Sequence, residues 1–567
     1  MSITPPEKWN QKTAKLFSAA RNGQTNILRK FQNEEPALLK TVDPVGNSVA
    51  HWAVKGGQVK ILRFLWANYP EVLWTVNVNG QQPVHTGCIA GKFLCVALLI
   101  DISSALEEPD ANGCTPLLLA SKHGRAEIAA YLLLLSANIN ATDDEGNTAL
   151  HLAARAGHTN LCSLLLFFGA NPFTTCNNRQ QTPLHLACEA GRFTVVRQFS
   201  RAVPNRNAII DKRMASKAIE EEFAHALQQR DHEGQSPFQA AKKNGWSEIS
   251  EFLGMKMSLY YLRRRSLWDA GHIRLTLKTF ILGEPGRRRL GVICIVVAIM
   301  CFIYPFYWIQ IWTDPYSWDE RQTLKLLWIL LHIPSWYCYF KATYSDPGFI
   351  PTETNDYQTV LRMSCYTRLR ASPEPAAERG DKDRLLDTEE LARIKRSLAS
   401  LCHTCQCVKP LRSKHCAVCD RCVKLFDHHC PLTDQCVGAK NHIWFFGLCA
   451  FTSALSTMFA YLLWTQSRSL EISWGWSAVF KIVLFAIWLC STGTFINVIH
   501  AATRNLTTNE TLNWERYSYL HRKANGSFRN PFDRGPIINV LEYFGFRSPM
   551  DPNCLDSVPS SPQSMEV

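Results

Sequence analysis

The chain has 567 residues, enough for several domains, and 46% of them are hydrophobic, but the apolar residues are unevenly distributed. Roughly the first 250 residues have the composition of a soluble protein, whereas long apolar runs follow after residue 289. Basic residues crowd the ends of these runs, so the formal net charge of +13 indicates membrane topology and not a nucleic-acid partner. Residues 1–24 are polar and lack an apolar core, so we expect no signal peptide.

A short motif recurs along the N-terminal half, usually between a Gly-containing turn and a second Gly. Its copies lie 33 or 34 residues apart, except for the last interval of 54 residues. This period and motif resemble ankyrin repeats, which are helix pairs that stack into one continuous core. With a degenerate copy near Lys15, we expect about seven repeats over residues 1–254. The other copies start at Ser48, Gln82, Thr115, Thr148, Thr182 and Ser236.

The long last interval predicts an insertion near residues 192–230, which is charged and is expected to lie outside the stacked core. Repeat arrays present extended binding surfaces, so we expect this one to dock protein substrates. The alternative is a passive spacer.

Four apolar segments approach the ~20 residues that cross the hydrocarbon core of a bilayer. Trp and Tyr near their ends favour membrane spans over buried core helices. Basic residues concentrate before the first segment, between the second and third, and after the fourth. The positive-inside rule then places both termini and the loop between the second and third spans in the cytosol. The segments are 290–312, 324–340, 443–466 and 482–502.

The remaining segments connect these parts. The basic stretch 255–289 is interpreted either as a membrane-surface segment or as a solvated linker. Residues 346–400 are predicted to be a cytosolic linker that is mobile before Cys402, apart from a short helix around 389–397. The predicted order is therefore ankyrin repeats 1–254, juxtamembrane segment 255–289, spans one and two 290–345, linker 346–400, Cys-rich domain 401–442, spans three and four 443–502, and cytosolic tail 503–567.

The Cys-rich domain holds eight of the 21 cysteines, together with four histidines, between Cys402 and Cys436. Such a cluster in a cytosolic segment indicates metal binding and not disulfides. Cys-x2-Cys steps with interleaved histidines favour tetrahedral Zn²⁺. Two such sites need eight ligands, and ten candidates remain when His403 and Cys407, which lie outside the spacing, are set aside. The two left over lie beside an Asp, and Cys, His and Asp together provide a nucleophile, a base and a group that orients the base.

The run Asp427-His428-His429-Cys430, in this spacing, resembles the DHHC family of protein S-acyltransferases (palmitoyltransferases), and the resemblance extends from about residue 290 to 546. Further family motifs are Asp346-Pro347-Gly348, Thr507-Thr508-Asn509-Glu510 and Asn539 ahead of an aromatic cluster. With the N-terminal array, the chain resembles the ankyrin-bearing subgroup of that family. The implied fold is all-α: an ankyrin solenoid, then a four-helix transmembrane domain with a cytosolic two-zinc module.

The resemblance also implies roles for the clustered residues. Cys430 would take the acyl group from palmitoyl-CoA or a similar acyl-CoA as a thioester and pass it to a substrate cysteine. His428 would act as the base, and Asp427 would orient it. Two structural zinc ions would have closed four-ligand sites. The first would be held by Cys402, Cys405, His415 and Cys422, and the second by Cys416, Cys419, His429 and Cys436.

Other implications of the resemblance concern ligand contacts and location. Lys409 and Arg412 correspond to family positions near the CoA phosphates, with solvated or lipid-facing charges as the alternative. Asn22 and Trp52 fall where ankyrin-bearing relatives grip extended peptides. Golgi or another endomembrane is the family's expected location. The chain departs from the family pattern at two positions, since Leu432 replaces the usual Trp and Gln435 the usual Asn.

Two other classes of protein compete with the enzyme hypothesis. In a non-enzymatic scaffold of ankyrin repeats and zinc sites, Cys430 and its neighbours His428 and Asp427 would have no function. An ankyrin-bearing ion channel is disfavoured by the lack of an evident pore loop and by the zinc-rich loop between spans two and three.

Overall fold

In the computed structural model the chain folds into two compact units. Unit 1 comprises Met1–Arg287 and Thr352–Val408, and unit 2 comprises Arg288–Pro351 and Lys409–Val567. The structure describes residues 11–103, 106–173, 177–201, 221–265, 318–364, 388–466, 474–517, 519–522 and 528–547.

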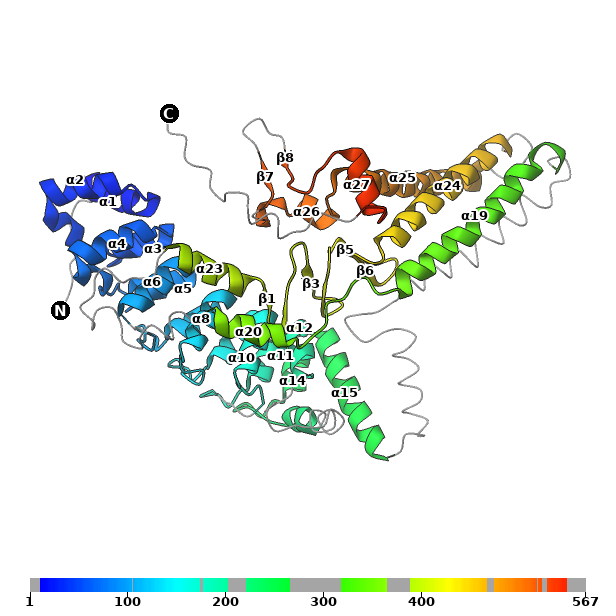
Figure 1. The fold of residues 1–567 in the computed structure, drawn as a ribbon. Coiled ribbons are helices and arrows are strands. Elements are labelled where there is room, and N and C mark those ends of the chain that lie inside the picture. Colours follow the sequence, from blue (N-terminus) through cyan, green and yellow to red (C-terminus); the bar gives the residue numbers. More distant parts are fainter. Residues whose placement is uncertain are drawn as a thin grey trace. The chain divides into compact units, whose positions relative to one another are not determined.

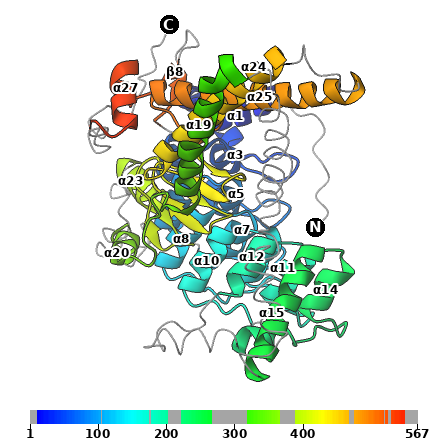
Figure 2. The ribbon, with the colours of Figure 1, turned by 90° about the vertical axis from the view of Figure 1, so that its right-hand side faces the viewer.

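Unit 1 contains a stack of helix pairs, which can be followed in order from α1 to α15 in Figures 1 and 2. Each first helix contacts the first helix of the next pair, and most second helices pack in the same way. The first helices are α1 (Gln11–Asn22), α3 (Val49–Gly56), α5 (Pro83–Ala90), α7 (Pro116–Lys122), α9 (Ala149–Ala156), α11 (Pro183–Glu189) and α14 (Pro237–Lys243). The second helices are α2 (Thr25–Glu34), α4 (Val59–Asn68), α6 (Phe93–Ser103), α8 (Ala126–Leu134), α10 (Thr159–Phe167), α12 (Phe193–Phe199) and α15 (Ser247–Arg265); η1 (Pro36–Lys40) and η2 (Pro70–Leu73) are short 3-10 helices.

The recurring motif explains how each first helix begins and how neighbouring repeats are tied together. In α3 the Ser48 backbone N–H donates to His51 Nδ1 (3.1 Å), which completes a capping box at the start of the helix. The other ring nitrogen, Nε2, then donates to the carbonyl of Gln81 in the next repeat (2.8 Å). His151 makes the same two contacts, with Thr148 and Gln181. The motif histidine is therefore an internal hydrogen-bonding residue of the stack.

This burial makes the array sensitive to acid. Burial lowers the pKa of His51 to about 4, against about 6.5 in the unfolded chain. The unfolded state then binds more protons between these values, so the stabilisation present above pH 6.5 is lost as the pH falls toward 4. We expect the protonation equilibrium of His51 alone to lower the free energy of unfolding by about 2 kcal/mol between pH 7 and pH 5. Hydrogen exchange of α3 in the intact protein, corrected for intrinsic rates, should therefore rise roughly 20-fold.

The matched variant for this test is His51→Gln, because Gln239 already fills the same capping position in α14. In this variant the increase in the exchange rate of α3 between pH 7 and pH 5 should be smaller by the roughly 20-fold contribution of His51. An undiminished rise would show that other groups cause the acid sensitivity.

The predicted insertion lies partly outside the described residues, but its end packs into the array. Phe223, Ala226 and Leu227 are buried in the main core, and the rings of Phe173 and Phe223 are 6.0 Å apart. The expectation that the insertion lies outside the core is therefore wrong for this end. The reason is an apolar i, i+3, i+4 face, which the charged neighbours obscure in the sequence.

The linker is also more ordered than expected in its described parts. The predicted short helix is present as α23 (Thr388–Ala399), and α20 (Asn355–Met363) precedes it. Leu391, Ile394 and Leu398 of α23 are buried in the same core cluster as the array. A short antiparallel hairpin follows, formed by β1 (Leu401–Cys402) and β2 (Cys407–Val408). Residues 365–387 lie outside the described residues.

Unit 2 contains the long helices α19 (Trp318–Tyr344), α24 (His442–Gln466) and α25 (Trp474–Arg504). Within the described residues, two segments are long and apolar enough to cross a membrane: His442–Tyr461 in α24 and Phe485–Arg504 in α25. They coincide with the third and fourth predicted spans. The second predicted span lies in α19, which includes Lys325 and Pro334 and does not reach that hydropathy. The first lies outside the described residues, so the count of four is not confirmed.

The rest of unit 2 consists of small hairpins and short helices, so the protein is mostly helical and not all-α. Closely spaced cysteines favour tight hairpins, because both residues of a pair must face the same point. The strands form the antiparallel pairs β3 (Lys414–Cys416) with β4 (Arg421–Val423), β5 (His428–Cys430) with β6 (Gln435–Val437), and β7 (His521–Arg522) with β8 (Phe528–Arg529). The C-terminal segment also contains α26 (Thr508–Leu512), the 3-10 helix η7 (Trp514–Arg516) and α27 (Pro536–Tyr543).

Candidate active site and metal centre

The second predicted ligand set forms a compact group within unit 2. Cys416 and Cys419 come from the β3–β4 hairpin, and His429 and Cys436 face each other across β5 and β6. One ligand atom from each of the four lies within 4.8 Å of all the others. Cys419 Sγ is 3.3 Å from His429 Nδ1 and 3.4 Å from Cys436 Sγ. Three thiols and one imidazole at this spacing fit a tetrahedral Zn²⁺ site.

The protonation of this group also favours a cation. Hydrogen bonds from Cys419 and Cys436 lower the pKa of Cys416, and hydrogen bonding with Cys416 and Cys419 raises the pKa of Cys436. The thiols thus share protons in a crowded space. A divalent cation would displace those protons and neutralise the thiolates.

The first predicted ligand set is divided between the units. Cys402 and Cys405 belong to unit 1, and His415 and Cys422 belong to unit 2. His415 and Cys422 are paired in register across β3 and β4. The backbone N–H of Cys405 donates to Cys402 Sγ (3.4 Å), and Cys419 and Cys416 repeat this contact. Both Cys-x2-Cys turns therefore have the same local geometry, while the four-residue set remains a prediction.

The three residues outside the ligand sets lie together: His428 and Cys430 are on β5, and Asp427 directly precedes it. His428 Nδ1 is 2.6 Å from Asp427 Oδ2. Burial opposes the charge of His428, but hydrogen bonds with Asp427 and Cys430 outweigh it and raise its pKa to about 9. Burial also opposes the thiolate of Cys430, but hydrogen bonds from His428 and Thr433 lower its pKa. This arrangement favours a thiolate and imidazolium pair, which is an activated nucleophile.

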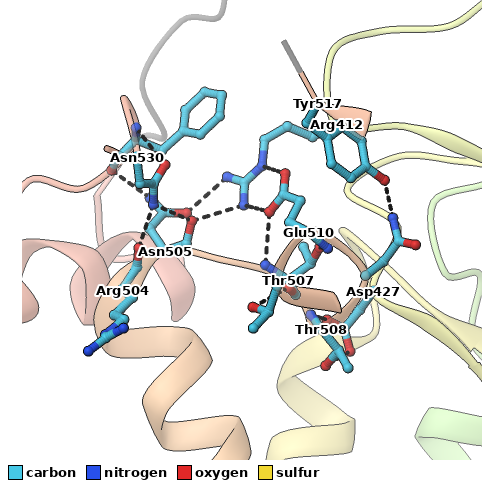
Figure 3. Close-up of polar contacts among 12 residues, drawn as sticks. Arg412, Asp427, Arg504, Asn505, Thr507, Thr508, Glu510, Tyr517 and Asn530 are labelled. Carbon is cyan, nitrogen blue, oxygen red and sulfur yellow. Dashed lines mark hydrogen bonds and ion pairs between the residues drawn. The ribbon is translucent and has the colours of Figure 1, made fainter. Parts of the chain in front are cut away.

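Asp427 is held from its other side by the segment after α25 (Figure 3). The backbone N–H of Thr508 donates to Asp427 Oδ1, and Thr508 Oγ1 donates to Oδ2 (3.0 Å). Thr507 caps α26, accepting from the backbone N–H of Glu510 (3.1 Å). The position of the carboxylate that is hydrogen-bonded to His428 therefore depends on the conformation of this turn.

Arg412 stabilises the same turn. Its Nε and Nη2 each lie 2.7 Å from one carboxylate oxygen of Glu510, and Nη1 donates to Asn505 Oδ1 (2.9 Å), as Figure 3 shows. Tyr519 donates a further hydrogen bond to Glu510 (2.8 Å). The side chains of Arg412 and Glu510 are only 10% and 2% exposed. The structure thus gives Arg412 an internal partner, and Lys409 is half-buried; the contact of both residues with the CoA phosphates stays a prediction.

Apolar side chains surround Cys430, which is 6% exposed. Val437, Phe445 and Cys449 form a cluster with it, and the rings of His428 and Phe445 are 5.2 Å apart. Leu432, the first departure from the family pattern, packs against this cluster. Gln435, the second, is paired with Cys430 across the hairpin. The nucleophile therefore faces an apolar environment between the hairpin and the start of α24.

The remaining predicted residues have identifiable positions. Asp346 accepts from the backbone N–H groups of Gly348 and Phe349 and from Lys440 Nζ (2.8 Å). Asn539, 1% exposed, donates to the carbonyl of Thr503 (2.7 Å) and ties α27 to the end of α25.

Asn22 and Trp52 lie on α1 and α3, two first helices in contact with each other. Trp52 is half-buried and donates to Asp43 Oδ2 (3.0 Å), and Lys55 Nζ lies 4.6 Å from the centre of its ring. Asn22 is exposed.

Sequence reasoning missed the link between Arg412 and Glu510. Glu510 follows Thr507 by three residues, so the capping box was recognisable. The partner of the carboxylate lies 98 residues away, and spacing alone carries no signal for such a pair. His403 was also not assigned, and it proves to be buried.

Comparison with known proteins gives matches over both parts of the chain. Residues 395–515 match the family described as DHHC palmitoyltransferase, and residues 69–143 and 133–208 match ankyrin repeats. Palmitoyltransferase Hip14 of Drosophila melanogaster is 26% identical over 243 residues, which is 39% of this chain and 33% of that protein. Palmitoyltransferase ZDHHC17 of Homo sapiens is 24% identical over 284 residues, 45% of this chain and 38% of that protein. Probable protein S-acyltransferase 23 of Arabidopsis thaliana is 26% identical over 335 residues, 55% of this chain and 56% of that protein. The chain thus spans only about a third of the length of the first two relatives.

Proposed function

We propose that this chain, which carries a DHHC palmitoyltransferase domain and ankyrin repeats, is a membrane-bound protein S-acyltransferase. The observation that carries the proposal is the placement of Cys430. It lies on the same hairpin as two residues of a four-ligand Cys/His group, yet it is not one of them. It is instead paired with His428 and Asp427.

The proposed reaction has two transfers. The Cys430 thiolate attacks the thioester carbonyl of an acyl-CoA, the CoA thiolate leaves, and the His428 imidazolium donates it a proton. Neutral His428 then accepts the proton of a substrate thiol, whose sulfur attacks the acyl-Cys430 thioester, and the Cys430 thiolate is released. Asp427 keeps the ring oriented in both steps. The apolar cluster around Cys430 suits a fatty acyl chain.

Two structural zinc ions are part of the proposal. The second ligand set supports one of them by its geometry, and the first set, Cys402, Cys405, His415 and Cys422, is proposed from the spacing and the family resemblance. A zinc with four protein ligands would fix the hairpins and leave no open position for catalysis. The chain's own residues therefore supply the nucleophile and the base.

The membrane arrangement is proposed as four spans with both termini and the Cys-rich domain in the cytosol. Two apolar helices and the distribution of basic residues support it. Golgi or another endomembrane is the proposed location. The same domain order is proposed as in the sequence analysis, with Asn22 and Trp52 as candidate contacts for protein substrates on the array.

Acyl labelling tests the proposal directly. The purified full-length protein in detergent, incubated with labelled palmitoyl-CoA, should acquire a label that hydroxylamine removes. Addition of a cysteine-containing acceptor protein should transfer that label. A scaffold would acquire label only at the rate of its heat-denatured form, and this result would contradict the proposal.

A further inference from the structure

Helix α6 is buried around its whole circumference, although it is a second helix of the array. A second helix normally leaves one face to solvent, and a helix that is buried all round needs a further partner. The partner is α23, which contacts both α6 and α8. The buried residues of α6 are Phe93, Cys95, Val96, Ala97, Leu98, Leu99, Ile100, Asp101 and Ile102.

Helix α23 has the pattern expected of such a cover. Leu391, Ile394 and Leu398 lie on one face, are at most 3% exposed and belong to the core cluster of the array. Arg396 is exposed on the opposite face, and Lys395, four residues after Leu391, is exposed at the edge of the apolar face. The helix is thus amphipathic, and its apolar side has a defined surface to bury.

Helix α20 makes a second attachment. Tyr357 is 1% exposed, and its ring meets that of Phe167 in α10 edge to face at 5.3 Å. The Tyr357 hydroxyl is hydrogen-bonded to His403 Nδ1 (2.8 Å), so the residue joins the array to the β1–β2 hairpin. The described residues 352–364 and 388–408 are called the strap below.

The hairpin itself is fixed to the array at two further points. The backbone N–H of His403 donates to Asn160 Oδ1 (3.1 Å), and Ser163 Oγ donates to Thr404 Oγ1 (3.3 Å). His403 and Thr404 lie between Cys402 and Cys405, two of the predicted zinc ligands. Helix α10 of the array therefore holds this Cys-x2-Cys turn.

We propose that the second-helix face of the array is an intramolecular docking surface: it binds the strap and thereby holds the Cys402–Cys407 hairpin, which carries two of the predicted zinc ligands. The strap occupies the part of this face formed by α6, α8 and α10, so protein substrates dock on other parts of the array. The inference rests on the proposed function only where it concerns the rate of acyl transfer. Asn160 and Tyr357 are positioning residues that act through the hairpin.

Hydrogen exchange of the intact protein in detergent tests the packing of α23 on α6. Ile394→Asp should raise exchange in both α23 and α6 at least about tenfold, because a charge on the apolar face releases the strap. The matched control Arg396→Asp places the same charge on the exposed face and should leave both helices protected. Unchanged exchange of α6 in Ile394→Asp would overturn the proposal.

A milder pair of variants tests the attachment of the hairpin to the array. This pair is decisive if Ile394→Asp unfolds the array, and loss of protection in α1 would reveal such unfolding. Asn160→Leu removes the acceptor for His403, whereas Asn160→Asp keeps it. Exchange of residues 402–407 should rise and self-acylation should slow in the first variant, and both should be restored in the second. Equal behaviour of the two variants would overturn the proposal. The exchange result stands even if the chain transfers no acyl group, so the two proposals fail separately.

Discussion

Replacing Cys430 with Ser is expected to abolish acyl transfer while leaving bound metal unchanged. The reason is that Cys430 provides the reactive thiol but is not part of the four-residue group of Cys416, Cys419, His429 and Cys436. A serine hydroxyl at this position would remain protonated and would not form the thioester. Measurement of zinc per chain together with hydroxylamine-sensitive label should show full metal and no label.

Two variants make this result interpretable. Cys436→Ser removes a predicted ligand, so zinc content should fall, and label should fall with it because structural zinc contributes to folding. Cys490→Ser removes an exposed cysteine of α25 and should retain both zinc and label. Loss of zinc from Cys430→Ser to the level of Cys436→Ser would identify Cys430 as a ligand, and the catalytic proposal would then be abandoned.

Much of this architecture could be predicted because its signals are local. The ankyrin motif encodes its own cap and its own turn, so the start of α11 at Pro183 follows from the sequence alone. The Cys-x2-Cys turns are equally local. The second ligand set came from the family resemblance, and its residues are brought together in the structure.

What the sequence did not predict depends on contacts between distant segments. The linker was expected to be mobile apart from a short helix around 389–397, and the burial of that helix was not predicted. Its residues Leu391, Ile394 and Leu398 pack on helices nearly 300 residues earlier in the chain. In the same way, Lys409 and Arg412 look alike in a basic segment. Only the fold distinguishes the half-buried Lys409 from Arg412, whose guanidinium is paired with Glu510.

Replacing Arg412 with Gln is expected to destabilise unit 2 and to slow acyl transfer. The change leaves the Glu510 carboxylate, 2% exposed, without its ion-pair partner, and loss of one partner from a buried pair costs about 3–5 kcal/mol. The turn that bears Thr508 would shift, and Asp427 would lose its donors. A displacement of this kind can reduce a rate by ~10²-fold. The measurements are the thermal inactivation midpoint and the rate of self-acylation as a function of acyl-CoA concentration.

The double variant Arg412→Gln with Glu510→Gln separates positioning from phosphate binding. Gln at position 510 preserves the capping box with Thr507 and removes the uncompensated charge, so stability and maximal rate should recover in large part. If Arg412 instead bound the CoA phosphates, Arg412→Gln would raise the apparent KM for acyl-CoA without loss of stability, and the second change would restore nothing. Lys409→Gln provides the comparison, since a half-buried lysine that contacts the phosphates should change KM alone. Recovery in the double variant would therefore assign the guanidinium to the turn that holds Asp427.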